Sequence, residues 1–137
     1  MYRSPIVINP DRPNWRATLG AEALTLGGAA LLYGGLEYLK GQFGFRGIGH
    51  EAYNVFQSVA TAAYITGMTR QVLRRPEVHK IIALVNYAIA GGLLGQQAYS
   101  LLMDLFNRTE TSDGLMGARL VGGAFGIVPG VRTLYGR

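Results

Sequence analysis

The pattern of apolar and polar residues along the chain predicts four helices joined by short polar connections. The apolar segments cover residues 15–40, 52–70, 78–106 and 114–131. A helix over residues 15–40 would be about 39 Å long at about 1.5 Å per residue, enough to cross a hydrocarbon core of about 30 Å. We therefore predict an all-α, polytopic integral membrane protein with three or four transmembrane helices and glycine-rich packing faces.

Small residues form a strip along the first predicted helix. Glycines recur every seven residues, with alanines between them, and the strip consists of Gly20, Ala23, Gly27, Ala30 and Gly34. Each glycine would weaken a helix in water by roughly 1 kcal/mol relative to alanine. In a bilayer the backbone hydrogen bonds persist, and small side chains allow close approach of another helix. The strip is therefore predicted to be a helix-packing face.

Two further small-residue patterns occur in the second half of the chain. The third predicted helix contains the G-x-x-x-G pair Gly91 and Gly95. In the last predicted helix small residues recur every four positions, at Gly114, Ala118, Gly122, Gly126 and Gly130. Both patterns favour close helix crossing in membranes. The last segment is barely long enough to span and contains Pro129, so a re-entrant or surface helix is the alternative.

The second predicted helix is more polar than the others. Spacings of three and four residues place Asn54, Gln57, Ser58 and Thr61 on one face. We expect this face to turn inward and form interhelical hydrogen bonds. The alternative is that it lines a pore or a ligand site.

Two charged residues, Glu22 and Arg119, fall inside predicted membrane segments. An ionisable group in a spanning helix is costly and needs a partner or a neutralising proton. We expect Glu22 to pair with a cation, either Arg119 or a residue of another subunit, or to be protonated. Glu37 lies beside Lys40, near the predicted end of its helix, where it would reach water.

The positive charges are distributed unevenly between the predicted connections. Arg70, Arg74, Arg75 and Lys80 lie between the second and third segments, and further arginines flank the two ends of the chain. By the positive-inside rule, four spans would place both termini on the cytoplasmic or matrix side. The cluster at residues 70–80 is predicted to bind anionic lipid headgroups. This arrangement accounts for the net charge of +5 without nucleic acid.

No catalytic chemistry is predicted. The chain has no cysteine, and its two histidines, His50 and His79, fall in connections on opposite sides of the predicted membrane. The G-x-G-x-x-A match from Gly47 to Ala52 follows a predicted helix, whereas a dinucleotide site requires a preceding strand. We expect no enzyme activity, metal, cofactor or small-molecule substrate.

The chain is predicted to have a short arm and a single membrane domain. Residues 1–14 form a polar, proline-containing arm that we expect to be retained, and residues 15–137 form the domain. The partners expected from this organisation are the lipid bilayer and other membrane subunits or copies of the same chain.

One segment resembles a known family. Residues 13–47, PNWRATLGAEALTLGGAALLYGGLEYLKGQFGFRG, resemble the first helix of the glycine-rich four-helix family. That family includes mitochondrial inner-membrane protein translocase subunits and an accessory subunit of complex I. The likeness covers about the first third of the chain and rests on glycine spacing, a Trp-Arg start and a Lys-Gly end. The family's arginine and aspartate signature is not matched, because His79 stands where the acid is expected after Arg75, and no site residue is transferred.

Three hypotheses for function follow. The first is a small non-catalytic structural or accessory subunit of a larger membrane protein assembly, packed through glycine and alanine faces. The second is a phage or viral membrane-associated protein: a virion membrane component, a DNA-ejection protein or a holin-like pore. The third is a small channel or translocase-type subunit.

Overall fold

The computed structural model describes residues 13–135, and these residues form four helices. They are α1 (Trp15–Phe43), α2 (Ile48–Val72), α3 (Ile81–Leu105) and α4 (Ser112–Tyr135). The prediction of an all-α fold is confirmed, and each helix extends within a few residues of its predicted bounds. Most of the predicted N-terminal arm, residues 1–12, lies outside the described residues.

Among the described residues, three helices are long and apolar enough to cross a membrane: α1, α3 and the part of α4 from Ser112 to Leu134. These helices indicate a membrane location. The least apolar helix is α2, because polar side chains recur along it. The last helix extends beyond the predicted residues 114–131 at both ends, so the shortness inferred from the sequence does not apply to it.

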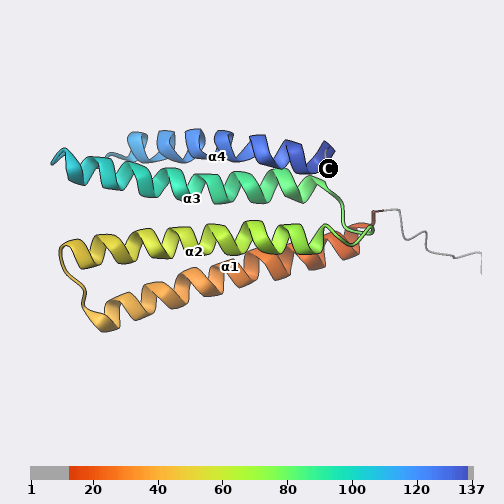
Figure 1. The fold of residues 1–137 in the computed structure, drawn as a ribbon, viewed down its shortest axis with the longest axis horizontal. Coiled ribbons are helices and arrows are strands. Elements are labelled where there is room, and N and C mark those ends of the chain that lie inside the picture. Colours follow the sequence, from red (N-terminus) through yellow and green to blue (C-terminus); the bar gives the residue numbers. More distant parts are fainter. Residues whose placement is uncertain (1–12, 136–137) are drawn as a thin grey trace, which may run out of the picture.

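The helices run antiparallel along one long axis and form an open row (Figure 1). Each packs against the next in the chain, α1 on α2, α2 on α3 and α3 on α4. In the described part of the chain α4 contacts only α3, and α1 contacts α3 over a short region. The four helices therefore do not close into a ring. The outer helices, α1 and α4, each have one face that no other helix of the described chain covers.

The start of α1 is attached to the connection between α2 and α3. Asn14 caps α1, since its side-chain oxygen accepts a hydrogen bond from Ala17 N at 2.7 Å, and its own N–H donates to Glu77 O at 2.9 Å. Thr18 Oγ1 accepts a bond from His79 N at 2.9 Å, and the ring of Trp15 stacks on that of His79. At its other end α1 stops at Gly44, whose φ of 65° suits glycine.

The interior between α1, α2 and α3 is built mainly from small residues. One cluster contains Ala29, Ala62, Ile65 and Ala90 from the three helices. Buried threonines line the same interior, and the hydroxyls of Thr25, Thr61 and Thr69 each donate to the carbonyl four residues earlier. The hydroxyl protons are thus satisfied within their own helix, and Thr25 and Thr61 can pack like apolar side chains, whereas Thr69 Oγ1 also accepts a bond from Asn86.

Candidate functional site

The small residues of α3 and α4 pack directly against one another. A Cβ added to Gly95 would lie 3.0 Å from Gly122 Cα and also collide with Ala118 O, and one added to Gly91 would collide with Gly122 O. A Cβ on Gly126 would meet the backbone of Tyr87. Gly91 and Gly95 are therefore in backbone contact with the α4 ladder, as we call the small residues that recur every four positions along α4.

The two ends of the α4 ladder lie against different parts of α3. A Cβ on Gly130 would lie 3.0 Å from Ala83 O, near the start of α3. Gly114, at the other end, lies against the side chain of Tyr99, whose hydroxyl accepts a bond from Thr111 N at 3.0 Å. The ladder is thus covered by α3 along its length.

The strip on α1 has a different environment. Gly20, Gly27 and Gly34 have no atom within 4 Å of an added Cβ, and Ala23 and Ala30 are exposed. The face of α1 turned toward α2 and α3 carries Thr18, Ala21, Thr25 and Ala29 instead. At 3.6 residues per turn, the two sets lie on opposite sides of the helix. The structure therefore places the strip on the outside of the row.

Glu22 lies at the junction of α1, α2 and α3. Its Oε1 accepts a hydrogen bond from Asn86 Nδ2 at 2.8 Å, and the same amide group donates to Thr69 Oγ1 at 2.9 Å. Asn86 is completely buried, and its Oδ1 has no partner among the described residues. Asn86 was not identified from the sequence as a site residue, and a single asparagine in the apolar run of α3 was the available signal.

The expected pairing of Glu22 with Arg119 is wrong within the chain. Arg119 Nε donates to Gln96 Oε1 at 2.7 Å, near the other end of α3. Asn86 and Gln96 are ten residues apart on α3, about 15 Å along its axis. Arg119 is the eighth residue of α4 and lies beside Gln96, so its side chain does not reach Glu22 in the first half of α1.

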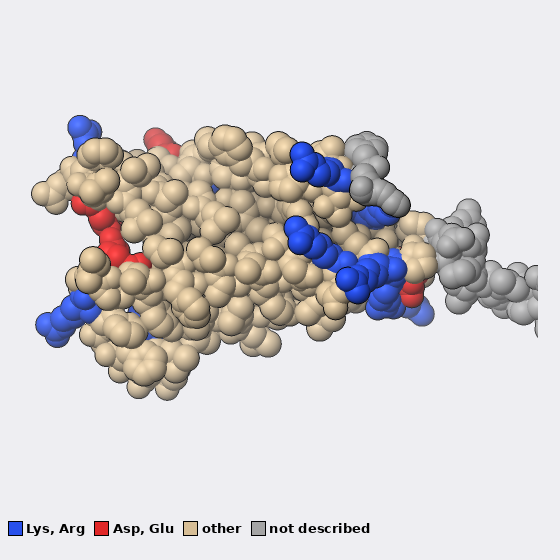
Figure 2. Space-filling view, in the orientation of Figure 1, with Lys and Arg blue, Asp and Glu red and all other residues tan. Residues whose placement is uncertain are grey.

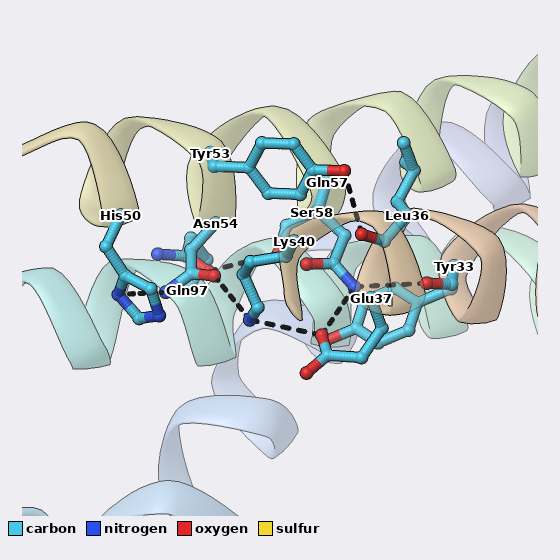
Figure 3. Close-up of polar contacts among 10 residues, drawn as sticks. All are labelled: Tyr33, Leu36, Glu37, Lys40, His50, Tyr53, Asn54, Gln57, Ser58 and Gln97. Atoms are coloured by element: carbon cyan, nitrogen blue, oxygen red, sulfur yellow. Dashed lines mark hydrogen bonds and ion pairs between the residues drawn. The ribbon is translucent and has the colours of Figure 1, made fainter. Parts of the chain in front are cut away.

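The polar face of α2 turns inward, as predicted, and contacts both neighbouring helices. Gln57, Ser58 and Thr61 are buried. Gln57 Nε2 donates to Glu37 Oε1 at 2.9 Å and to Tyr33 O at 3.1 Å, while Ser58 Oγ donates to Gln97 Oε1 at 3.1 Å (Figure 3). These bonds link α2 to α1 on one side and to α3 on the other.

The same polar contacts continue to the end of the helices. Lys40 Nζ lies 3.1 Å from Glu37 Oε1 and donates to Asn54 Oδ1 at 2.8 Å. Asn54 Nδ2 lies 3.4 Å from His50 Nδ1. Glu37 is 53% exposed, as expected for a side chain that reaches water, and it also pairs with Lys40; Figure 3 shows these side chains directed toward one another between α1 and α2.

A polar cavity of about 500 Å³ opens beside these contacts. Its carboxylates come from α1, α2, α3 and the connection that follows α3: they are Glu37, Glu51, Asp104 and Glu110. The sequence alone does not predict this cavity, because no two of these acids share a helix. Within residues 13–135 no group of three or more histidines and acids has an arrangement that would hold a metal ion.

The predicted headgroup-binding cations lie at the opposite end of the molecule, where the described chain begins. Figure 2 shows lysine and arginine side chains gathered there. Arg75 Nη2 pairs with Glu77 Oε2 at 3.0 Å. The pKa of Glu77 is lowered, first by a hydrogen bond from its own backbone N–H and then by Arg75. Arg74 and Lys80 are exposed, and Arg70 Nε donates to the hydroxyl of Tyr87 at 3.1 Å.

The two histidines lie at opposite ends of the molecule along the helix axes, as the sequence predicted. His50 belongs to the polar contacts near the cavity, and His79 stacks on Trp15. The G-x-G-x-x-A match begins at Gly47, just before α2, and its other residues form the first turn of α2, a helix that follows another helix.

Comparison with protein-family models, with curated proteins and with solved structures finds no significant match to this chain.

Proposed function

We propose that this chain is a small, non-catalytic subunit of a larger membrane protein assembly, and that the outward strip of α1 is where another membrane helix packs. The observation that carries this proposal is the contrast between the two sets of small residues. The glycines at the centre of the α3–α4 contact lie against the backbone of the facing helix, whereas an added Cβ on Gly20, Gly27 or Gly34 would have no atom within 4 Å.

A glycine face that contacts no other helix contributes little to stability in a bilayer. Glycine packs against lipid tails no better than leucine does. Its advantage is that it allows close backbone contact with another helix. Large apolar side chains flank the strip, including Leu24 and Leu31, which are 58% and 80% exposed. Leu24 and Leu31 are seven residues apart on the same flank of the strip, so a helix that docks on the strip would pack against both. The open row adds support, because α1 is an outer helix and nothing in the described chain covers this side.

The proposed orientation places the end with the α2–α3 connection on the cytoplasmic or matrix side. If all four helices cross, that end holds Arg16, Arg70, Arg74, Arg75, Lys80 and Arg132, and the other holds Lys40, Arg46 and Arg108. This excess favours the assigned orientation. The cation-rich end would then meet the anionic leaflet.

The test is recovery of the assembly from membranes in mild detergent. The wild-type chain and the variants Gly27→Leu and Gly34→Leu are each purified through an affinity tag, and copurifying proteins are identified and quantified by mass spectrometry. We expect both glycine variants to lose most of the partners, because a leucine on the strip prevents close approach. Leu39→Ala is the control and should retain them, because Leu39 is exposed on a side of α1 that is turned away from the strip.

Recovery of the same partners with Gly27→Leu and Gly34→Leu as with wild type would contradict the proposal. The identity of the partners separates the classes of assembly. Subunits of a respiratory, photosynthetic or translocase complex would support a cellular accessory subunit. Virion proteins would instead support a phage or viral membrane protein.

A further inference from the structure

An apolar groove with a volume of about 480 Å³ lies between α2, α3 and α4. Residues of all three helices line it, and one end carries a cation. The lining includes Thr66 and Arg70 of α2, Gly91 and Gly95 of α3, and Phe125 and Pro129 of α4.

The groove exists because α2 and α4 pack on α3 without touching each other in the described chain. Gly91 and Gly95 bring α4 close to α3, and together with Ala90 they leave only small residues on this part of the groove floor. The floor is therefore smooth and apolar. From Tyr87 to Gly95 it extends about 12 Å along α3, comparable with half of a hydrocarbon core of about 30 Å.

Arg70 marks the end of the groove nearest the α2–α3 connection. Its Nε donates to the hydroxyl of the buried Tyr87, which fixes the guanidinium at the groove. Among residues 13–135 no carboxylate lies within ion-pair distance of it. An arginine at the edge of hydrocarbon is stabilised by an anionic partner, and its planar fork suits a phosphate.

Further cations adjoin the same end. Arg74 follows Arg70 by four residues in the chain, and Arg132 follows Pro129 by about one helical turn. Both are exposed. The groove thus combines a long apolar floor with a positive end, a charge distribution complementary to that of an anionic phospholipid.

We propose that this groove binds one anionic phospholipid, with its phosphate at Arg70 and an acyl chain along Gly91 and Gly95. This is a defined site within the row of helices, distinct from general attraction of the basic end to a charged surface. It is also independent of what packs on the strip of α1.

The full chain, purified in mild detergent, is titrated with dioleoyl phosphatidylglycerol or with dioleoyl phosphatidylcholine, and bound lipid is counted by native mass spectrometry. The wild type should bind one phosphatidylglycerol more tightly than phosphatidylcholine. Arg70→Gln should lower the affinity for phosphatidylglycerol about tenfold, the effect of losing one charge-assisted hydrogen bond. Arg108→Gln, which removes a cation at the other end, is the control and should bind as wild type does. An equal loss in both variants would show diffuse charge attraction and overturn the proposal.

A second variant tests the acyl chain. Thr66→Phe places a ring in the groove, so it should weaken phosphatidylglycerol binding while Arg70 remains. Unchanged binding in Thr66→Phe, together with displacement of the lipid by inorganic phosphate, would mean that the site takes free phosphate, and would overturn the lipid proposal. Circular dichroism checks the fold of each variant. Should Arg70→Gln fail to fold, equal affinity of the wild type for the two lipids still refutes the site.

Discussion

At the residue scale, the interior is held together by polar side chains that reach a partner on another helix. Asn86 is the clearest case, because its amide group donates both to Glu22 on α1 and to Thr69 on α2. One buried side chain therefore joins three helices. The cost of burying it is offset by these bonds, while its Oδ1 has no partner among the described residues.

This geometry makes a prediction about Glu22 and Asn86. Glu22→Gln keeps a side-chain oxygen that accepts the Asn86 bond, so thermal unfolding of the chain in detergent should change little. Asn86→Leu removes the donor and leaves Glu22 without its partner, so it should destabilise the fold by about 1–3 kcal/mol. Ile89→Leu, at an exposed position of the same helix, is the control. If Glu22→Gln were as damaging as Asn86→Leu, the negative charge of Glu22 would have to matter, and a cation outside the chain would be its partner.

At the scale of elements, α1 and the α3–α4 pair use small residues in opposite ways. The small residues of α3 and α4 form the contact between those two helices, at backbone distance. On α1 one small-residue face, with Ala21 and Ala29, packs inward, and the glycine strip on the other side is free of contacts within the described chain. A substitution in the α3–α4 contact should therefore change the stability of the isolated chain. A substitution on the α1 strip should change only its assembly with partners.

We expect Gly95→Leu to destabilise the isolated chain and Gly27→Leu to leave it unchanged. A leucine at Gly95 collides with the backbone of α4, and overpacking of this kind costs about 1–3 kcal/mol or more. A leucine at Gly27 points away from the row. Thermal unfolding of the two purified variants in the same detergent gives the comparison. Equal destabilisation by Gly27→Leu would mean that the α1 strip supports the fold of the single chain.

At the scale of the whole molecule, the two ends along the helix axes differ in their charged residues. One end contains the start of α1, the α2–α3 connection and the last turn of α4, and it is rich in arginine (Figure 2). The other holds the polar cavity with its carboxylates. Four crossing helices would expose these ends on opposite sides of the membrane.

The absence of cysteine from the sequence allows this arrangement to be tested by labelling. Single substitutions Gln42→Cys, Gln71→Cys and Thr109→Cys lie at exposed positions near successive ends of helices. An impermeant maleimide added to intact cells or organelles should label Gln42→Cys and Thr109→Cys but not Gln71→Cys, which should react after permeabilisation. Labelling of both Gln42→Cys and Gln71→Cys in intact membranes would contradict four crossings.

Local sequence features were sufficient to predict the four helices, the membrane character and the inward polar face of α2. Hydrophobicity and three-to-four-residue spacing are properties of a segment by itself, so they can be interpreted without knowledge of its neighbours. The separation of His50 from His79 followed from the same helix count.

Only the tertiary structure decided which neighbours meet. Both sides of α1 carry small residues, so its composition did not show that Ala21 and Ala29 would face inward and Gly27 outward. The partner of Glu22 was decided by the register of α3, which places Asn86 beside it and leaves Arg119 about 15 Å further along. The acids of the cavity come from four segments, and only the packing of those segments brings them together.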